Sequence, residues 1–504
     1  RCSWRRLPDE NRECAEIKRY LDTNYREDIS LDLLAELAHL NKYYLAHTFQ
    51  REYGISPITY LNRRRIEESK HMLGNTGYSL AQISELMGFS SPSYFSQCFR
   101  KAEGLTPMNT AVRCGRDNAL PRQNGMKYNE NEEFMMKSVT FSLLQSAANA
   151  FDFGGPVLCD AHHYGEGHIN DTFVVWREDH SKRFILQRIN TDTFTNPVGL
   201  MENVCGVTRH LRAKILAEGG DPARETLNVI PTLSGSTCYL DADGGAWRAY
   251  DFVEDTICLQ QVGSETDFRT VAETLGKFQN QLEDYPASTL HETIARFHDT
   301  PNRYANFEKA LAADALGRAK NITSEIEFIH ARKQDCHVLL DQLAAGEIPL
   351  RVTHNDTKIN NVLIDAATGK GICVIDLDTV MPGLSAYDFG DSIRTGANDC
   401  AEDEPDQSKV HFDLHLYEVF AKGYLSTAGA SMSMAEKKSL AWGARLMTLE
   451  CGIRFLTDYL EGDHYFHIAR PDHNLDRART QFTLVRQMEE VFDQMLEIVC
   501  PDNH

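Results

Sequence analysis

Two short patterns of apolar residues at helical spacing recur near the start of the chain. They occupy residues 29–40 and 78–89, and Ser30 and Ser79 stand where a hydroxyl can cap the first backbone N–H groups of a helix. Each is followed by a second segment, 41–57 or 91–107, and the two segments match at Tyr44/Tyr94, Phe49/Phe99, Gly54/Gly104 and Pro57/Pro107. Each copy therefore predicts helix, tight turn, helix and a glycine stop, so that residues 1–112 form an all-α domain of two helix-turn-helix units in tandem.

The stretch between the two copies predicts one connecting helix from Pro57 to about Leu73. At about 1.5 Å per residue this helix spans about 25 Å. A connector of that length can hold two recognition helices roughly one turn of DNA, about 34 Å, apart on one face of a duplex.

The second helix of each copy has an apolar and a polar face. The apolar side chains are expected in the core: Tyr44, Leu45, Phe49, Phe95 and Phe99. The polar side chains are predicted to reach base edges in the major groove, where amide and cationic groups suit the acceptors: Lys42, Tyr43, His47, Gln50, Ser93, Gln97 and Arg100. Arg63, Arg64 and Arg65 of the connecting helix are expected to contact phosphates or to pair with Glu67 and Glu68.

This arrangement resembles the DNA-binding domain of AraC/XylS-type regulators over residues 14–112. The more specific stretch is GFSSPSYFSQCFRKAEGLTP at 88–107. That family usually continues past the Thr-Pro with Tyr-Arg, whereas here Thr106-Pro107 is followed by MNTAVR. The resemblance implies that residues 1–112 bind duplex DNA.

Charge divides the 504-residue chain, whose net charge is −21. Residues 1–125 contain 18 Lys and Arg against 15 Asp and Glu, a balance of +3, and the remainder carries −24. Only the first quarter is therefore suited to approach a polyanion, although a charge-balanced helical surface fits +3 equally well.

The segment 113–137 loses apolar periodicity and gains Asn, Gly, Pro and charge, so it is predicted to be a linker between two fused proteins. The thirteen cysteines form no C-x-x-C pair, which favours reduced thiols over a disulfide framework or a zinc site. No apolar stretch approaches the roughly 20 residues that span a bilayer, and no signal-peptide pattern opens the chain. The expectation is a cytoplasmic protein with no membrane partner.

The strongest chemical signal is RVTHNDTKINNVLIDAATGKGICVIDLDT at 351–379. An apolar strand leads into Asp356, Asn361 follows on the same loop, and Asp376 ends a second apolar strand. Phosphoryl transfer needs an acceptor hydroxyl aimed in line and metal ions across the phosphates. Asp356 is predicted to accept the hydroxyl proton, and Asn361 and Asp376 to offer oxygen ligands to Mg²⁺. His354 is expected to hold the loop.

The segment before this loop suggests a nucleotide site. HYGEGHINDTFVVW at 163–176 is a turn between two strands, and the backbone around Gly165 and Gly167 is predicted to cover phosphates, although a plain hairpin fits as well. In RFILQRIN at 183–190, Gln187 and Arg188 point to opposite faces of one strand. Backbone groups from Phe252 to Glu254 are predicted to bind the adenine edge.

The loop at 351–379 resembles that of the aminoglycoside phosphotransferase and choline kinase group. This resemblance implies an α+β bilobal fold like that of the protein kinases, with a smaller lobe at 138–262 and a larger lobe at 263–504. It also implies that Asp388 braces the catalytic loop. In that group the position of Gln187 normally holds a Lys or Arg for the nucleotide phosphates, so the clamping residue here is in question.

Several further segments resemble the N-acetylhexosamine 1-kinases from about residue 140 to 495, among them GEGHINDTF, ARFHDTPNRYANF and MTLECGIRFLTDYLEGDHYF. The resemblance implies ATP and Mg²⁺, phosphorylation of the anomeric hydroxyl of an N-acetylhexosamine, and a sugar site lined by Arg454 and Tyr465. The alternative for these two residues is an Arg454–Asp458 pair beside a core tyrosine. Two other functions stay open: a kinase for another amino sugar or an aminoglycoside, and a sugar-sensing regulator without turnover.

Overall fold

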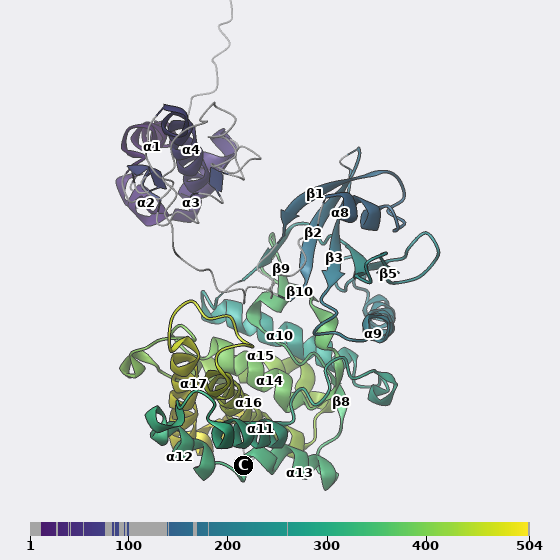
Figure 1. Cartoon of the computed structure of the whole chain (residues 1–504). Coiled ribbons are helices and arrows are strands. Elements are labelled where there is room, and N and C mark those ends of the chain that lie inside the picture. The colour runs from purple at the N-terminus through teal and green to yellow at the C-terminus, as the bar shows by residue number, and fades with distance from the viewer. Residues whose placement is uncertain are drawn as a thin grey trace, which may run out of the picture. The chain divides into compact units, whose positions relative to one another are not determined.

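The computed structural model divides into two compact units, residues 1–135 and 136–504, here termed the N-terminal and C-terminal units (Figure 1). The structure describes residues 12–75 except 27–28, 39, 41 and 54; then 83–84, 86–89, 95 and 98–99; and 139–501 except 140, 165–168, 180 and 260. The predicted linker at 113–137 lies outside the described residues, as do Ser93, Gln97 and Arg100 and the turn with Gly165 and Gly167.

The described helices of the N-terminal unit are α1 (Arg12–Asn24), α2 (Leu31–Ala38), α3 (Lys42–Tyr53) and α4 (Pro57–Asn75). Ser30 caps α2, because its Oγ accepts a hydrogen bond from the Leu33 N–H at 3.2 Å. The connecting helix predicted from Pro57 is confirmed as α4, and it runs to Asn75.

Helix α4 contributes to two small cores, one for each helix-turn-helix unit. Leu61 packs in the first core, whose members include Leu45 and Phe49, and Ile66 packs in the second, with Phe95 and Phe99. The predicted burial of Leu45, Phe49, Phe95 and Phe99 is thus confirmed, while the side chain of Tyr44 lies outside the described residues. Because both cores share α4, the connector is part of the packing of each unit.

Two leucines of the apolar patterns at 29–40 and 78–89 are exposed. Leu37 is 47% exposed and Leu86 is 43% exposed, and they occupy the same place in the two copies. The buried face of α2 runs through Leu34 and Ala35, with Ala38 partly buried beside them, so Leu37 is left at its edge. The apolar spacing therefore does not by itself tell which leucines of the pattern are buried.

The three arginines of α4 differ in their surroundings. Arg64 forms an ion pair with Glu68 at 2.7 Å, one of the two roles predicted for it. Arg65 is buried, donates from Nε to the Tyr25 carbonyl at 2.6 Å and lies 5.4 Å from the Phe89 ring centroid. A phosphate contact is therefore wrong for Arg65, which ties α4 to the chain that follows α1. Gly88 next to this site has φ +76°, and a Cβ there would lie 2.4 Å from the Arg26 carbonyl oxygen.

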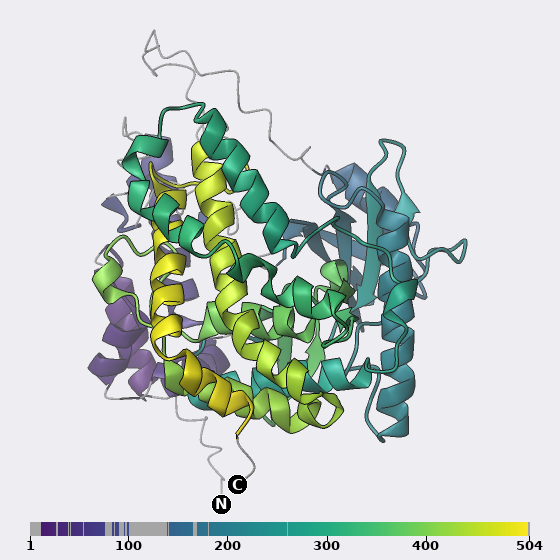
Figure 2. The same ribbon diagram turned by 90° about the horizontal axis from the view of Figure 1, so that it is seen from below.

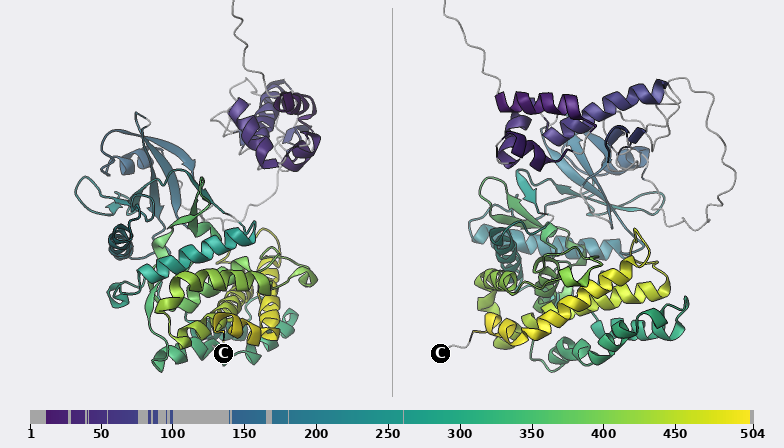
Figure 3. Two further views of the ribbon diagram at one scale, coloured as in Figure 1. Left: turned by 180° about the vertical axis from the view of Figure 1, so that it is seen from behind. Right: turned by 90° about the vertical axis from the view of Figure 1, so that its left-hand side faces the viewer.

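The smaller lobe of the C-terminal unit is an antiparallel sheet flanked by helices (Figures 1 and 3). The strand order is β1-β2-β3-β6-β4, with β5 also paired to β6. The bounds are α8 (Phe141–Ala148), β1 (Val157–His163), β2 (Asp171–Arg177), β3 (Arg183–Ile189), α9 (Pro197–Ala217), β4 (Val229–Ile230), β5 (Tyr239–Leu240) and β6 (Ala246–Asp251). One sheet face packs with α8 through Phe184 and Trp247, and the other turns Tyr250 toward the main core.

The larger lobe is mostly helical, with four short strands of its own and a fifth, at 256–258, that comes from the end of the smaller lobe. The strands are β7 (Thr256–Cys258), β8 (Arg351–Thr353), β9 (Val362–Asp365), β10 (Gly371–Val374) and β11 (Met381–Gly383), paired as β10-β9-β7 and β11-β8. The α-helices are α10 (Glu265–Gln281), α11 (Thr300–Ala313), α12 (Thr323–Ala331), α13 (Val338–Ala344), α14 (Ser385–Gly396), α15 (Leu414–Ala428), α16 (Met434–Glu461), α17 (His473–Glu490) and α18 (Phe492–Val499). The 3₁₀ helices are η1 (Ala287–Thr289), η2 (Ala319–Asn321), η3 (Asp335–His337), η4 (Ile359–Asn361), η5 (Leu377–Thr379), η6 (Gln407–Lys409) and η7 (Gly429–Ser431).

Helix α16 is the centre of the larger lobe and lies beside α17, as Figure 2 shows in yellow-green and yellow. It begins with a capping box between Ser433 and Glu436. On its other side α14 approaches it at Gly390 and Gly443, where a Cβ on Gly443 would lie 2.0 Å from the Ala386 carbonyl oxygen. This close contact fixes α14, which carries Asp388 and Asp391 toward the site described below.

These two units confirm the predicted fold class, an all-α tandem helix-turn-helix domain followed by an α+β bilobal domain. Among the residues that the structure describes, no helix is both long enough and apolar enough to span a membrane.

Candidate functional site

Asp388 of α14 holds the loop between β8 and η4 through hydrogen bonds to its backbone. The Asp388 carboxylate accepts the N–H of His354 at 2.9 Å and the N–H of Asn355 at 2.7 Å. Asn355 has a left-handed backbone, φ +65°, and its side chain donates to the Thr379 carbonyl at 2.9 Å. Asp388 therefore braces the loop, as the resemblance to the aminoglycoside phosphotransferase and choline kinase group implies.

His354 is fully buried and connects the loop to the strand that ends before Asp376. Its Nε2 lies 2.8 Å from the Ile375 carbonyl oxygen, and its Nδ1 lies 3.3 Å from the backbone nitrogen of Asp356. The first contact requires a proton on Nε2, so Nδ1 is free to accept from Asp356. His354 thus holds the loop, in agreement with its predicted structural role.

The same contacts bring Asp356, Asn361 and Asp376 together. The Asn361 side chain donates to the Asp356 carbonyl at 2.8 Å, and the Ile375 N–H donates to the Asn361 carbonyl at 2.9 Å. Asp376 follows Ile375 in a left-handed conformation, φ +60°, and the residue is partly exposed. Desolvation by the surrounding protein, with repulsion from Asp378 and Asp356, raises the pKa of Asp376 to about 6.

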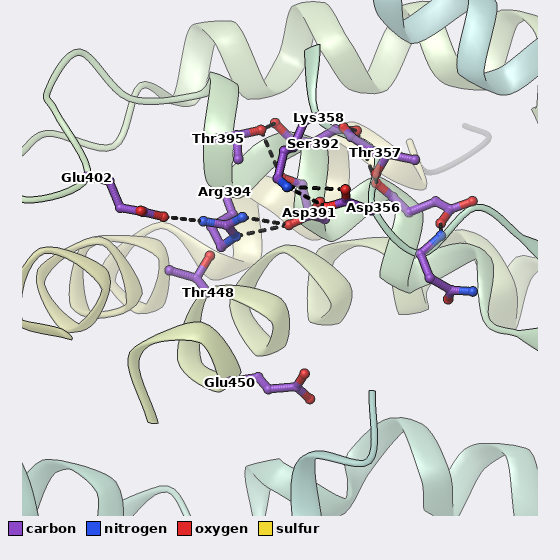
Figure 4. A network of polar contacts seen from close by, with 12 residues as sticks. Asp356, Thr357, Lys358, Asp391, Ser392, Arg394, Thr395, Glu402, Thr448 and Glu450 are labelled. Atoms are coloured by element: carbon purple, nitrogen blue, oxygen red, sulfur yellow. Dashed lines mark hydrogen bonds and ion pairs between the residues drawn. The ribbon is translucent and has the colours of Figure 1, made fainter. Parts of the chain in front are cut away.

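Lys358 lies between the carboxylates of Asp356 and Asp391 (Figure 4). Its Nζ is 2.9 Å from Asp356 Oδ1 and 3.1 Å from Oδ2. Arg394 donates to Asp391 at 2.8 and 3.0 Å and to Glu402 at 2.9 Å, which makes a row of alternating charges behind the loop. Desolvation opposes the charge of Lys358, but Asp356 and Asp391 raise its pKa overall.

The oxygen groups of this loop fit a magnesium ion shared with phosphates. The Asn361 amide nitrogen is committed to Asp356, which leaves its oxygen as the group to offer a cation. Repulsion among Asp356, Asp376 and Asp378 is the situation that a divalent cation relieves. Within the described residues, no three His, Cys, Asp or Glu side chains form a metal cluster, and Mg²⁺ typically takes only one or two carboxylates besides phosphate oxygens and water.

The predicted nucleotide residues that can be located have firm partners. Gln187 accepts from Arg248 Nε at 2.9 Å and donates to Thr172 Oγ1 at 2.9 Å. The Glu254 carboxylate pairs with Arg183 at 2.7 Å, and its backbone carbonyl accepts from Arg224 at 2.9 Å. Gln187 therefore sits in a polar network of the sheet, and Glu254 orders the segment that follows β6.

Arg454 and Tyr465 line one cavity of about 220 Å³, together with Arg303 of α11. The guanidinium of Arg454 is 5.9 Å from the Tyr465 ring centroid, and Tyr465 is 72% exposed. The alternative of an Arg454–Asp458 pair beside a core tyrosine is wrong, because Asp458 instead accepts the backbone N–H groups of residues 464, 465 and 466 at 2.8–2.9 Å. It thereby shapes the turn that presents Tyr465.

Sequence reasoning missed a buried link between this cavity and the catalytic loop. His298 is largely buried between Glu450, at 3.1 Å from Nδ1, and the Asn355 carbonyl, at 3.1 Å from Nε2. Glu450 also accepts from Thr300 Oγ1 at 2.6 Å. Glu450 and Arg454 lie one turn apart on α16, a spacing that could have suggested a common face.

The predicted DNA-contacting residues lie on α3 as far as the structure describes them. Lys42 opens this helix and is partly buried, and Gln50 near its end is exposed. Tyr43 and His47 also belong to α3, but their side chains lie outside the described residues.

Comparison with known proteins places both units. Residues 160–422, more than half of the chain, match the model of the phosphotransferase enzyme family. The chain belongs to this phosphotransferase family. Kinases of this family use ATP. Residues 34–113 match a helix-turn-helix domain model, so the chain joins an AraC-type helix-turn-helix domain, which implies DNA binding, to a phosphotransferase domain.

The curated relatives match the helix-turn-helix part. An HTH-type transcriptional regulator of Escherichia coli, YdiP, is 40% identical over 88 residues, and YisR of Bacillus subtilis is 33% identical over 93 residues. Each match covers 18% of this chain, and 29% and 32% of those regulators, so the chain spans about three tenths of their length.

Solved structures resemble the phosphotransferase unit at low identity. An aminoglycoside phosphotransferase from Alicyclobacillus acidocaldarius gives a TM-score of 0.48 at 13% identity, covering 70% of this chain and 96% of that one. A microcompartment-associated aminopropanol kinase gives 0.46 at 16% identity, covering 70% and 98%.

Proposed function

We propose that the C-terminal unit transfers a phosphoryl group from ATP to the C1 hydroxyl of an N-acetylhexosamine. The observation that carries the proposal is the convergence of Asp356, Asn361 and Asp376 through backbone and side-chain hydrogen bonds to one loop. That set is suited to accept the hydroxyl proton and to hold a metal ion, and a protein that only senses sugar has no use for it.

Each residue of the loop has a role in this proposal. Asp356 accepts the proton of the attacking hydroxyl and orients that oxygen. Asn361 and Asp376 would hold Mg²⁺, which supplies charge neutralisation on the phosphates when bound. Lys358 pairs with the Asp356 carboxylate, with its Nζ 2.9 Å from Asp356 Oδ1. Gly165, Gly167, Gln187 and Glu254 are proposed to surround the nucleotide.

The acceptor is proposed to bind in the 220 Å³ cavity. Arg303 and Arg454 line it, and within the described residues neither forms an ion pair with a carboxylate. The Arg303 Nε is buried and has no hydrogen-bond partner among the residues that the structure describes. Guanidinium donors of this kind suit sugar hydroxyls and an acyl carbonyl, and the Tyr465 ring can pack on a sugar face.

A kinetic panel tests the acceptor. ATP turnover is measured with N-acetylglucosamine, N-acetylgalactosamine, glucosamine, glucose and an aminoglycoside. The proposal predicts turnover with the first two. It also predicts that Arg454→Lys raises the KM for the sugar and leaves the KM for ATP unchanged, because the Arg fork is lost only at the acceptor. Arg486→Lys, an exposed arginine on α17, is the matched control.

Other outcomes of the panel identify the other functions. Turnover confined to glucosamine or the aminoglycoside would replace the acceptor and keep the kinase. Sugar binding without any ATP turnover would favour a sugar-sensing regulator.

We propose further that the N-terminal unit binds duplex DNA with base contacts from Lys42, Tyr43, His47 and Gln50, and from Ser93, Gln97 and Arg100. The proposed division is a DNA-binding domain at 1–112, a linker at 113–137 and lobes at 138–262 and 263–504. A cytoplasmic location fits both activities.

A further inference from the structure

The centre of strand β6 carries a cation that is shut off from solvent. Arg248 is 1% exposed, and its Nη1 forms an ion pair with Oδ1 of Asp378, whose side chain is 3% exposed. Arg248 belongs to the sheet of the smaller lobe, whereas Asp378 belongs to η5 of the larger lobe, two residues after Asp376. A buried ion pair therefore joins the lobes beside the proposed metal ligand.

The other oxygen of Asp378 is also held by the smaller lobe. The Asn170 side chain donates from Nδ2 to Asp378 Oδ2 at 2.6 Å, and its Oδ1 accepts the Asn190 N–H at 2.9 Å. Asn170 stands immediately before β2, at the end of the turn predicted to cover phosphates. From a third direction, Asn203 of α9 donates to the Val380 carbonyl at 3.0 Å. The segment 378–380 is thus held by β6, by α9 and by the residue before β2, all in the smaller lobe.

The residue opposite Arg248 explains why the cation is on β6. Gln187 of β3 pairs in register with Arg248, and its Oε1 accepts from Arg248 Nε at 2.9 Å. Gln187 is itself oriented by Thr172 of β2 at 2.9 Å. Strand β3 therefore carries the neutral Gln187, which orients the guanidinium of Arg248 on β6 toward Asp378.

Stability alone does not account for this pair. Burying two charges costs several kcal/mol per ion by desolvation, and apolar residues of similar volume often serve stability equally well. A buried pair does fix geometry, because each partner has few alternatives once it is dry. Here the pair fixes the position of β6 relative to the turn that carries Asp376.

We propose that Arg248 is a positioning residue for the metal-bound nucleotide. Through Asp378 it fixes the Asp376 turn against the strands beside the nucleotide, so that the metal ligand and the phosphates meet in register. This inference rests on the proposed role of Asp376 as a Mg²⁺ ligand. It does not depend on which acceptor the enzyme uses.

The test measures ATP affinity by calorimetry on the full chain, with Mg²⁺ and with EDTA, so no acceptor is needed. The variants are Arg248→Lys, Arg248→Met and the neutral double variant Arg248→Met with Asp378→Asn, which leaves no unpaired buried charge. Arg188→Met is the matched control, because Arg188 lies on the same sheet but faces the other side, 6.0 Å from the Trp247 ring centroid. Thermal unfolding checks that each variant is folded.

The wild type is expected to bind ATP more tightly with Mg²⁺ than with EDTA. In the double variant, the enhancement of ATP affinity by Mg²⁺ should fall at least tenfold, while the ATP affinity in EDTA should stay nearly unchanged. Arg248→Lys should retain part of the enhancement. Arg188→Met should behave as wild type. A folded double variant with the full Mg²⁺ enhancement would overturn the positioning role and leave the kinase proposal intact. A wild type without any enhancement would contradict the metal role of Asp376 and this inference with it. If the double variant does not fold, full enhancement in folded Arg248→Met overturns the inference.

Discussion

Replacing Asp356 with asparagine separates the charge of the proposed general base from its structural contacts. The hydrogen bonds that anchor this residue use its backbone: its N–H lies 3.3 Å from His354 Nδ1, and its carbonyl accepts from Asn361 at 2.8 Å. The side chain has one partner among the described residues, Lys358. Asparagine has nearly the same volume, so the substitution keeps the loop and removes only the carboxylate charge.

The effect on stability should be small and the effect on turnover large. The Asp356 and Lys358 side chains are 22% and 46% exposed, and such exposed ion pairs contribute at most about 1 kcal/mol to stability. General-base assistance is worth about 10²–10⁴ in rate, and at about 1.36 kcal/mol per tenfold that is about 2.7–5.4 kcal/mol in the transition state. The kcat should therefore fall by this factor with little change in the KM of ATP or sugar.

The assay is steady-state ATP turnover with saturating sugar, accompanied by thermal unfolding. Asp341→Asn, an exposed aspartate on α13, is the matched control and should leave kcat unchanged. A folded Asp356→Asn enzyme with near-wild-type kcat would refute the assignment of Asp356. A variant that loses most of its stability would refute the separation of charge from anchoring.

Three further predictions concern the two units. Residues 1–125 should bind duplex DNA more weakly as the salt concentration rises. In a fluorescence titration, Gln50→Ala should lower the preference for a chosen site, and Arg64→Ala should weaken binding to all sequences alike. Failure to bind DNA at low salt would contradict this prediction. Residues 136–504 alone should keep the kcat of the full chain. In the full chain, the affinity for sugar should shift less than fivefold when DNA is added. A larger shift, matched by an equal effect of sugar on DNA affinity, would show that the two sites are coupled. Burial alone would lower the pKa of His298, but the hydrogen bond and charge of Glu450 raise this pKa overall. The His298–Glu450 pair therefore stabilises the fold below pH 6.5, and this stabilisation is lost as the pH rises through the pKa of His298 in the folded protein. Glu450→Gln should flatten that loss in unfolding titrations across this range, and an unchanged slope would contradict it.

Local patterns carried much of the fold. Ser30, Pro57 and the apolar positions of the second helices predicted α2, α4 and two cores, because caps, proline and helical spacing act within a few residues. The loop with Asp356 and Asn361 was visible for the same reason, since both residues lie on one short segment.

Contacts between distant segments were not visible in the sequence. Arg248 and Asp378 are 130 positions apart, and nothing local distinguishes Arg248 from the partly exposed arginines of other strands. Arg65 belonged to a run of three arginines that suggested phosphate contacts, yet the packing of α4 turns this one inward. His298 meets Glu450 only because α16 lies beside the start of α11. Such partners depend on tertiary packing, which spacing along the chain does not encode.

The most direct test of the central proposal is the structure of the product. The full chain is incubated with ATP, Mg²⁺ and N-acetylglucosamine or N-acetylgalactosamine, and the reaction is followed by ³¹P and ¹H NMR. The account predicts a sugar phosphate whose phosphorus couples to the anomeric proton, formed in equal amount with ADP. Phosphate on another hydroxyl, or release of inorganic phosphate with no sugar phosphate, would contradict it.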